Sequence, residues 1–232
     1  MKSLKQIQSE VKAQSKLTLS IDCVIFGYDD KKLKLLLIKS DLQLYKNQWS
    51  LLGNLVDTDE ELDAAAYRIL VERTGLKDIY LEQVQTFGKL HRHPGGRVVS
   101  VAYLSLINVD QHELCKPDHE LHWHDVDALG SLAFDHSEIL EVCLGRLRKR
   151  IMESPLVFSL LPRKFSMRSL QNVYEVILGC RFDRRNFRKK FFAMDYLIDL
   201  GEMEKNVTHR PGKLYRFNHK KYQKSKDKEF DI

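Results

Sequence analysis

The stretch LLGNLVDTDEELDAAAYRILVERTGL, residues 51–76, decides the fold of this chain. It starts with a strand end and a turn at Gly53, after which apolar residues recur at helical spacing from Leu62 to Leu70. Gly75 follows, a residue that readily adopts the left-handed conformation with which many helices end. The stretch therefore predicts a loop and an amphipathic helix whose apolar face packs on a sheet.

Segments on both sides of this helix predict the sheet. They are rich in β-branched and aromatic residues, and they cover residues 17–30, 32–40, 80–93, 97–109 and 120–129. A second amphipathic helix is predicted over residues 132–154, with Asp135 as its cap. Strands interleaved with two helices are typical of an α/β or α+β sandwich. Residues 4–14 fit either a short polar helix or an arm.

Charge is distributed unevenly along the chain. Residues 146–232 hold 22 Lys and Arg against 10 Asp and Glu, a net charge of +12, whereas residues 1–145 hold 16 against 22. Ser154-Pro155 breaks the second helix, so we predict two domains, 1–153 and 154–232. The basic second part indicates a polyanionic partner, with a merely solvated basic face as the alternative.

The second domain has the pattern of a winged helix-turn-helix. Ser166 begins a helix that reaches Leu178, and residues 184–201 predict a second, strongly basic helix after a short turn. Residues 203–217 predict a hairpin with its tip at residues 210–213. In a winged helix-turn-helix, the second helix lies in the major groove and presents its first residues to the bases.

Double-stranded DNA is therefore the expected partner of this domain. Arginine can bridge guanine O6 and N7, asparagine can pair with adenine, and lysine can hold phosphates. The residues expected to contact DNA are Arg168, Ser169, Gln171, Arg184, Arg185, Asn186, Arg188, Lys189, Lys190, His209, Arg210, Lys213 and Tyr215.

Other classes of protein are disfavoured by composition. No apolar run of about 18 residues is present to span a bilayer, and the polar first residues lack the apolar core of a signal peptide, so we expect a cytoplasmic protein without a membrane partner. The cysteines form no CxxC pair, and we interpret them as reduced packing residues: Cys23, Cys115, Cys143 and Cys180.

Residues 51–76 also resemble the Nudix box, GX5EX7REUXEEXGU with U aliphatic, and the glycine-rich opening that often precedes it. Gly53 matches the first glycine of that opening, and Asn54 takes the place of the box glycine. Glu60 matches the first glutamate, and Arg68 matches the arginine. The resemblance implies a Nudix-like α/β/α sandwich, followed here by the C-terminal winged helix-turn-helix in an α+β chain.

The resemblance fails at the residues that bind the metal. The three glutamates that hold the catalytic divalent cation in Nudix enzymes fall on Ile69, Glu72 and Arg73, so only one of them is kept. Hard divalent cations need several oxygen ligands, and pyrophosphate hydrolysis needs the cation to activate water. We therefore expect no enzymatic activity, no catalytic residues, no bound metal and no cofactor.

The chain from about residue 17 to residue 217 resembles the Nudix-related transcriptional regulators. The resemblance lies in residues 86–88, 96–103, 132–136, 170–175 and 185–190. It implies a homodimer that binds a palindromic operator and senses a small molecule, which is ADP-ribose in one branch of that family and L-arabinose in another. Because no GxxxxGK[ST] phosphate loop is present, we favour L-arabinose.

A sugar pocket needs polar groups at fixed positions beside an apolar wall. The residues expected to line it are Asp22 on the first strand, Gly53 and Asn54 at the turn, and Lys89, His91 and His93 on the strand after the helix. Each of them could equally be an ordinary edge-strand or turn residue. His122 and His124 share one face of a strand, which leaves a metal site open as a weaker alternative.

Two other functions compete with a sugar-responsive regulator. One is an active Nudix hydrolase of ADP-ribose or a related nucleoside diphosphate, with the basic domain as a nucleic-acid-binding accessory. The other is an RNA-binding adaptor, which is weaker because the sequence shows no RRM or KH signature.

Overall fold

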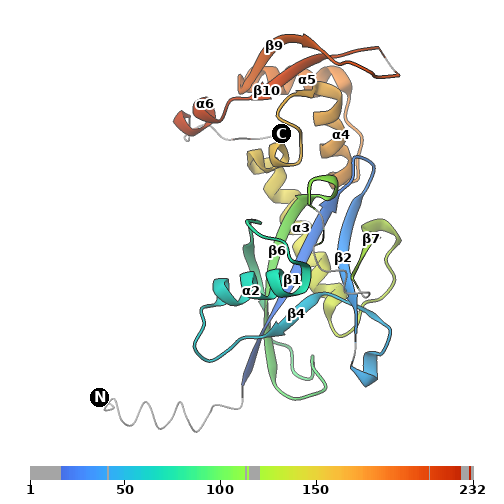
Figure 1. The fold of residues 1–232 in the computed structure, drawn as a ribbon, viewed down its shortest axis with the longest axis vertical. Coiled ribbons are helices and arrows are strands. Elements are labelled where there is room, and N and C mark those ends of the chain that lie inside the picture. Colours follow the sequence, from blue (N-terminus) through green and yellow to red (C-terminus); the bar gives the residue numbers. More distant parts are fainter. Residues whose placement is uncertain are drawn as a thin grey trace, which may run out of the picture.

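The computed structural model describes residues 17–40, 42–112, 114, 121–208, 210–225 and 230. A Nudix-like domain built on one large sheet lies below a smaller helical domain with its own three-stranded sheet (Figure 1). The predicted N-terminal helix or arm, Cys115 and His209 lie outside the described residues. Within the described part of the chain, no helix is long and apolar enough to cross a membrane.

The large sheet has seven strands organised around β1 (Thr18–Tyr28). β1 runs parallel to β6 (Val98–Asn108) over its whole length, and β5 (Glu82–Phe87) lies beyond β6. On the other edge, β1 pairs first with β4 (Leu52–Leu55) and then with β2 (Leu33–Lys39). β2 also pairs with β3 (Trp49–Ser50) and β7 (Leu121–Asp125), so the five strand segments predicted in the first domain all contribute to one sheet.

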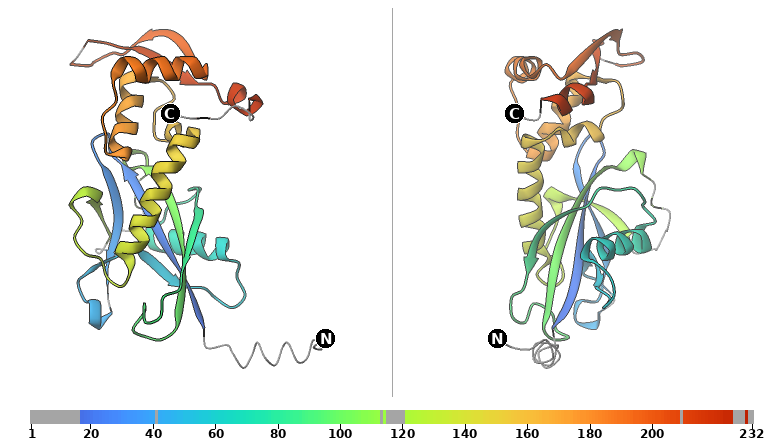
Figure 2. Two further views of the ribbon diagram at one scale, coloured as in Figure 1. Left: turned by 180° about the vertical axis from the view of Figure 1, so that it is seen from behind. Right: turned by 90° about the vertical axis from the view of Figure 1, so that its left-hand side faces the viewer.

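Two helices cover opposite faces of this sheet, as predicted (Figure 2). α2 (Leu62–Thr74) buries Ala65, Ala66, Ile69 and Leu70 against Cys23 and Ile25 of β1. α3 (His136–Glu153) packs on the other face, which carries Val24 and Phe26. Gly75 ends α2 with φ 73°, and its N–H donates to the Val71 carbonyl, which confirms the predicted cap.

The C-terminal domain is a winged helix-turn-helix. Ser166 caps α4 (Met167–Leu178), because its hydroxyl accepts a hydrogen bond from the Ser169 N–H. Asp183 caps α5 (Arg184–Met194), because its carboxylate accepts one from the Asn186 N–H. The strands β8 (Phe165–Ser166), β10 (Lys213–Phe217) and β9 (Leu197–Met203) form the small sheet, and α6 (His219–Lys224) follows. Short 3-10 helices occupy Gln43–Tyr45, Val109–Gln111, Val126–Ala128 and Pro155–Ser159.

Two boundaries in this domain differ from the sequence prediction. The basic helix was expected to reach residue 201, but it ends at Met194, because Asp195 adopts the left-handed conformation with φ 59°. Leu197 and Ile198, which the predicted helix would have included, lie on β9 instead. The hairpin therefore starts at Leu197 rather than at Met203, and the wing is longer than predicted.

The two domains share one hydrophobic core. Phe26 and Leu106 of the large sheet belong to the same buried cluster as Phe158, Tyr174 and Phe187 of the C-terminal part. α3 runs from the Nudix-like domain to the base of α4, where the Arg148 Nε donates to the Ile177 carbonyl at 3.1 Å. α3 ends at Glu153, and 1–153 and 154–232 remain the predicted domain limits.

Candidate functional site

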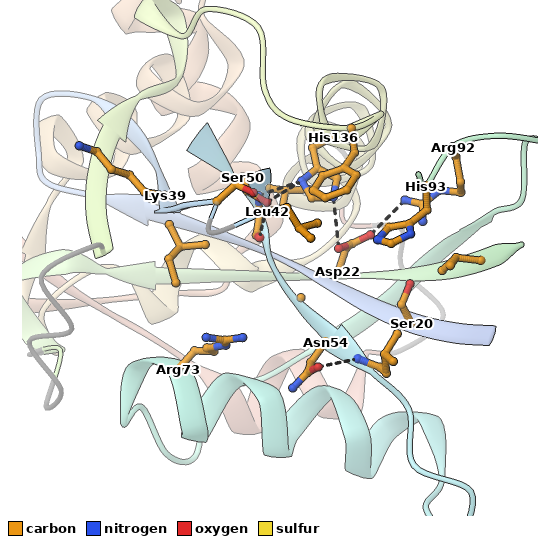
Figure 3. Close-up of a pocket in the computed structure, with 17 residues that line it drawn as sticks. Ser20, Asp22, Lys39, Leu42, Ser50, Asn54, Arg73, Arg92, His93 and His136 are labelled. Atoms are coloured by element: carbon orange, nitrogen blue, oxygen red, sulfur yellow. Dashed lines mark hydrogen bonds and ion pairs between the residues drawn. The ribbon is translucent and has the colours of Figure 1, made fainter. Parts of the chain in front are cut away.

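A pocket of about 330 Å³ opens beside the first half of β1. Its walls come from β1 to β4, from the end of α2, and from the loops that precede β6 and α3 (Figure 3). The lining residues are Ser20, Asp22, Ile38, Lys39, Ser40, Leu42, Ser50, Leu51, Gly53, Asn54, Leu55, Arg73, Arg92, His93, Val98, Phe134 and His136.

Asp22 is the buried carboxylate at the centre of one wall. Its Oδ2 accepts a hydrogen bond from the Ser100 hydroxyl at 2.5 Å and lies 3.4 Å from a guanidinium nitrogen of Arg92. Its Oδ1 lies 3.5 Å from the His136 Nε2. A buried carboxylate is tolerated only when it is paired and hydrogen-bonded, and these three partners meet that requirement.

Arg92 ties Asp22 to the start of α3. Its guanidinium also grips Asp135 with two hydrogen bonds, of 2.8 and 2.7 Å, in the bidentate geometry that strengthens such pairs. Only 4% of the Arg92 side chain is exposed. Burial opposes its charge, but hydrogen bonding to Asp135 and the nearby Asp22 outweigh burial and raise the pKa of Arg92. The Asp135 side chain had been predicted to cap α3. It makes no capping hydrogen bond and instead binds Arg92 beside the pocket.

His136 is a neutral imidazole in the same wall. The Leu51 N–H donates to its Nδ1 at 3.0 Å, so Nδ1 acts as an acceptor and the ring proton lies on Nε2, towards Asp22. Burial, more than any other influence, lowers the pKa of His136. The ring thereby joins Leu51, the residue between β3 and β4, to the first turn of α3.

Gly53 is required by the close approach of β4 to Asp22. A Cβ atom at this position would lie 2.5 Å from the Asp22 Oδ1 and 2.8 Å from the Ile21 carbonyl oxygen. Neither contact is compatible with a side chain, because β1 and β4 are hydrogen-bonded here. The glycine leaves the Asp22 carboxylate accessible from the pocket.

Aromatic rings lie beside these polar groups. The His93 and Phe134 rings are stacked, with 5.3 Å between centroids and 7° between planes. The centroid of the Phe134 ring also lies 4.4 Å from that of Tyr45 and 5.0 Å from that of His136. The pocket therefore combines hydrogen-bonding side chains with adjoining aromatic rings, of which His93 and Phe134 line it.

The Nudix-box residues form an ion-pair cluster in place of a metal site. Arg68 binds Glu60 through two hydrogen bonds, of 2.9 and 2.5 Å, and holds the pKa of Glu60 at about 2. Glu72, the one retained metal glutamate, also pairs with Arg68, at 3.3 Å. Ile69 is buried in the core, whereas Arg73 lines the pocket.

These residues do not fit a divalent cation. A Nudix metal site needs several carboxylates around one point, but two of the three positions hold an isoleucine and an arginine. Across the described ranges, no cluster of three or more His, Cys, Asp or Glu side chains could hold a metal ion. His122 and His124, the alternative metal pair, pack their rings against Trp49 instead.

The structure brings together four of the six predicted pocket residues: Asp22, Gly53, Asn54 and His93. The other two lie outside it. Residues 89–93 form a loop after β5 rather than a strand, so alternation of side chains does not apply to them. Lys89 pairs with Glu138 on the surface at 2.6 Å, and His91 is exposed with φ 62°.

Sequence reasoning missed Arg92 and His136 as pocket residues. Arg92 lies between two residues that had been selected, but nothing in the sequence distinguishes an arginine buried by tertiary contacts from an exposed loop arginine. Arg73 had been identified only as an obstacle to metal binding, and its place in the pocket follows from the pitch of α2.

A second groove lies between α4, α5 and the wing. Seven residues predicted to contact DNA line it: Arg168, Gln171, Arg184, Arg188, Arg210, Lys213 and Tyr215. Arg185, Asn186, Lys189 and Lys190 are exposed on α5 beside it, and Ser169 is half-buried at the start of α4. Tyr215 is itself buried and packs against Phe192, so it supports the groove more than it presents a polar group.

The fold and the two sites define a Nudix domain joined to a DNA-binding winged helix. Family models agree: the NUDIX domain matches residues 16–143, and the NrtR DNA-binding winged helix domain matches residues 157–217. The chain is 36% identical over 205 residues to the ADPR responsive transcriptional repressor NtrR of Acinetobacter baylyi, covering 86% of this chain and 81% of that protein. It belongs to the family of NrtR-like regulators.

Solved structures support this assignment. NrtR of Shewanella oneidensis in complex with a 27mer DNA superimposes with a TM-score of 0.73 at 31% identity, over 86% of this chain and 93% of that chain. The Nudix domain of the same protein in complex with ADP ribose superimposes with a TM-score of 0.54 at 28% identity, over 63% of this chain and 99% of that chain.

The neutral His136 makes folding stability depend on pH. Its pKa in the folded protein lies below the value of about 6.5 expected when unfolded, so the unfolded chain takes up a proton first as pH falls. The contribution is complete above about pH 6.5 and is lost below it, with a slope of at most about 1.4 kcal/mol per pH unit. We expect urea unfolding between pH 7.5 and 5.5 to show this loss, and His136→Gln to reduce the slope.

The control is His91→Asn, because His91 is exposed and asparagine tolerates its positive φ. It should keep the slope of the unaltered protein. Equal slopes for His136→Gln and the unaltered protein would contradict the assignment of the neutral ring, whatever the absolute stabilities.

Proposed function

We propose that this protein is a transcriptional repressor that binds ADP-ribose in its Nudix pocket and does not hydrolyse it. The observation that carries the proposal is the pocket, which keeps the Nudix scaffold but has Ile69 and Arg73 at two of the positions of the metal ligands. Similarity over 86% of the chain to a repressor named as ADPR responsive supports the choice of effector. Binding to DNA would place its action in the cytoplasm.

The chemistry of the pocket favours ADP-ribose over L-arabinose. ADP-ribose combines an aromatic base, two sugars and a negatively charged diphosphate. The stacked His93 and Phe134 rings suit a base, Asp22 and Asn54 suit sugar hydroxyls, and the Arg73 guanidinium supplies a positive charge. A neutral pentose has no aromatic base to stack on the His93 and Phe134 rings and no negative charge to pair with an arginine. L-arabinose, expected from sequence, finds no support in the relatives above and is kept as the alternative effector.

The effector can be identified by its action on the complex with DNA. We expect ADP-ribose to lower the affinity of the full-length protein for an operator selected from random duplexes, in electrophoretic mobility shifts at constant salt. L-arabinose at the same concentrations should have no effect. Release by L-arabinose alone would overturn the ADP-ribose assignment. Robust turnover of ADP-ribose with magnesium would favour the hydrolase instead.

We further propose that the groove between α4, α5 and the wing is the DNA-contacting face, with a homodimer on a palindromic operator. Arg184 and Arg188 lie on one side of α5 and reach this groove, while Arg210 and Lys213 reach it from the wing. The exposed Arg185, Asn186, Lys189 and Lys190 extend the same basic surface. Two-fold symmetry would place two such helices in successive major grooves.

Arg188→Ala should weaken DNA binding by about 1–3 kcal/mol. If Arg188 contacts a phosphate, the slope of the logarithm of the binding constant against the logarithm of the salt concentration should also become shallower by about one. The measurement is fluorescence anisotropy of a labelled operator across a range of salt concentrations. Lys149→Ala removes the same charge from an exposed position on α3 and should change neither quantity. An unchanged affinity for Arg188→Ala would exclude this groove as the contact surface.

Signalling from the pocket to the DNA-binding helix has a direct structural route. β1 carries Asp22 in the pocket and Tyr28 at its other end. The Asn172 side-chain amide on α4 donates to the Tyr28 hydroxyl at 3.0 Å and to the Asp30 carbonyl at 2.7 Å. We propose that a change at the pocket end of β1 reaches α4 through this contact, with a coupling of about 1–3 kcal/mol.

Tyr28→Phe tests that route, because it removes the hydroxyl and leaves the buried ring in place. The variant should bind ADP-ribose and operator separately as the unaltered protein does, but the effector should release less DNA. Tyr67→Phe is the matched control, since the Tyr67 hydroxyl accepts a hydrogen bond from the Asp78 backbone N–H within the Nudix domain. Full release by Tyr28→Phe would show that the coupling runs elsewhere.

A further inference from the structure

Arg73 occupies the place where the Nudix box would supply its third metal glutamate. It lies in the last turn of α2 and points from that helix into the pocket, below the strand that carries Asn54 (Figure 3). Glu72, its neighbour in sequence, is turned towards Arg68. Of Glu72 and Arg73, therefore, only the guanidinium of Arg73 lines the cavity.

The charge of Arg73 is free for a ligand. Arg92, the other arginine of the pocket, is neutralised by Asp22 and Asp135. The ammonium group of Lys39 lies over the Trp49 ring, 5.5 Å from its centroid. Within the part of the chain that the structure describes, Arg73 forms neither a hydrogen bond nor an ion pair. An anion that entered the pocket would therefore meet the Arg73 guanidinium with no carboxylate bound to it.

We propose that the Arg73 guanidinium takes the place of the divalent cation and forms a subsite for the diphosphate of the effector. This inference rests on the proposed binding of ADP-ribose in the same pocket. A guanidinium is permanently charged and can give two parallel hydrogen bonds to one phosphate. It offsets one of the two negative charges of the diphosphate, and no carboxylates are needed to hold it in place.

The same substitution separates binding from hydrolysis. A divalent cation lowers the pKa of a bound water and so generates the nucleophile that attacks a pyrophosphate. A guanidinium has no coordination site for water and cannot do this. Arg73 would therefore give the pocket affinity for a diphosphate and leave the bond intact, as a sensor requires.

The test is isothermal titration calorimetry of the full-length protein, with ADP-ribose in EDTA and in magnesium, and with inorganic pyrophosphate and adenosine in EDTA, because magnesium itself complexes free pyrophosphate. The unaltered protein should bind ADP-ribose equally well in both buffers and should bind pyrophosphate in EDTA. Arg73→Ala should weaken both by about 10- to 100-fold, the loss of a charge-assisted hydrogen bond, and should leave adenosine unchanged. Arg73→Lys, which keeps the charge and loses the bidentate geometry, should fall between them.

Lys77→Ala is the matched control, because it removes one positive charge from an exposed site just beyond the same helix. It should bind all three probes as the unaltered protein does, and thermal unfolding should show that every variant is folded. The proposal would be overturned if binding of ADP-ribose required magnesium, or if neither ADP-ribose nor pyrophosphate bound. It would also be overturned if Arg73→Ala bound them as tightly as the unaltered protein does. If ADP-ribose binds through Arg73 but leaves the affinity for DNA unchanged, the proposed function is contradicted while the diphosphate subsite is supported.

Discussion

The buried carboxylate of Asp22 is the constraint on which the site depends. It lies in the central strand of the sheet, where an unpaired charge would cost several kcal/mol. Ser100 on the adjacent strand, Arg92 on a loop and His136 at the start of α3 all bind it. Three segments distant in sequence are thereby fixed around one point.

β1 and α3 both connect that point to the DNA-binding domain. Asp22, Val24, Phe26 and Tyr28 lie on one face of β1, and the last of them meets α4. α3 starts at the pocket with His136 and ends beside the base of α4. Because the core is continuous between the domains, a movement of either element would change the packing of the winged helix.

The Nudix scaffold is retained while two of its three motif glutamates are replaced. Arg68 and Glu60 still bind each other and hold the loop before α2, a structural role that does not need a metal. Ile69 contributes to the core and Arg73 to the pocket. Two of the three motif glutamates are thus replaced on one helix while the fold stays intact, because Ile69 extends the apolar face of that helix and Arg73 lies off it in the pocket.

The sequence by itself determined the elements: the large-sheet strands, the helices α2 and α4, the cap at Gly75 and the winged helix-turn-helix all follow from local periodicity and turn chemistry. It also indicated Asp22, Gly53, Asn54 and His93, because the Nudix resemblance places the cleft there. The end of α5 was misjudged, since Asp195 in a left-handed conformation interrupts an apolar pattern that continues on β9. Only the tertiary structure decided that Arg92 and His136 belong to the pocket, that Lys89 and His91 do not, and that Asn172 meets Tyr28. Those outcomes depend on burial and on contacts between distant segments, which local patterns do not encode.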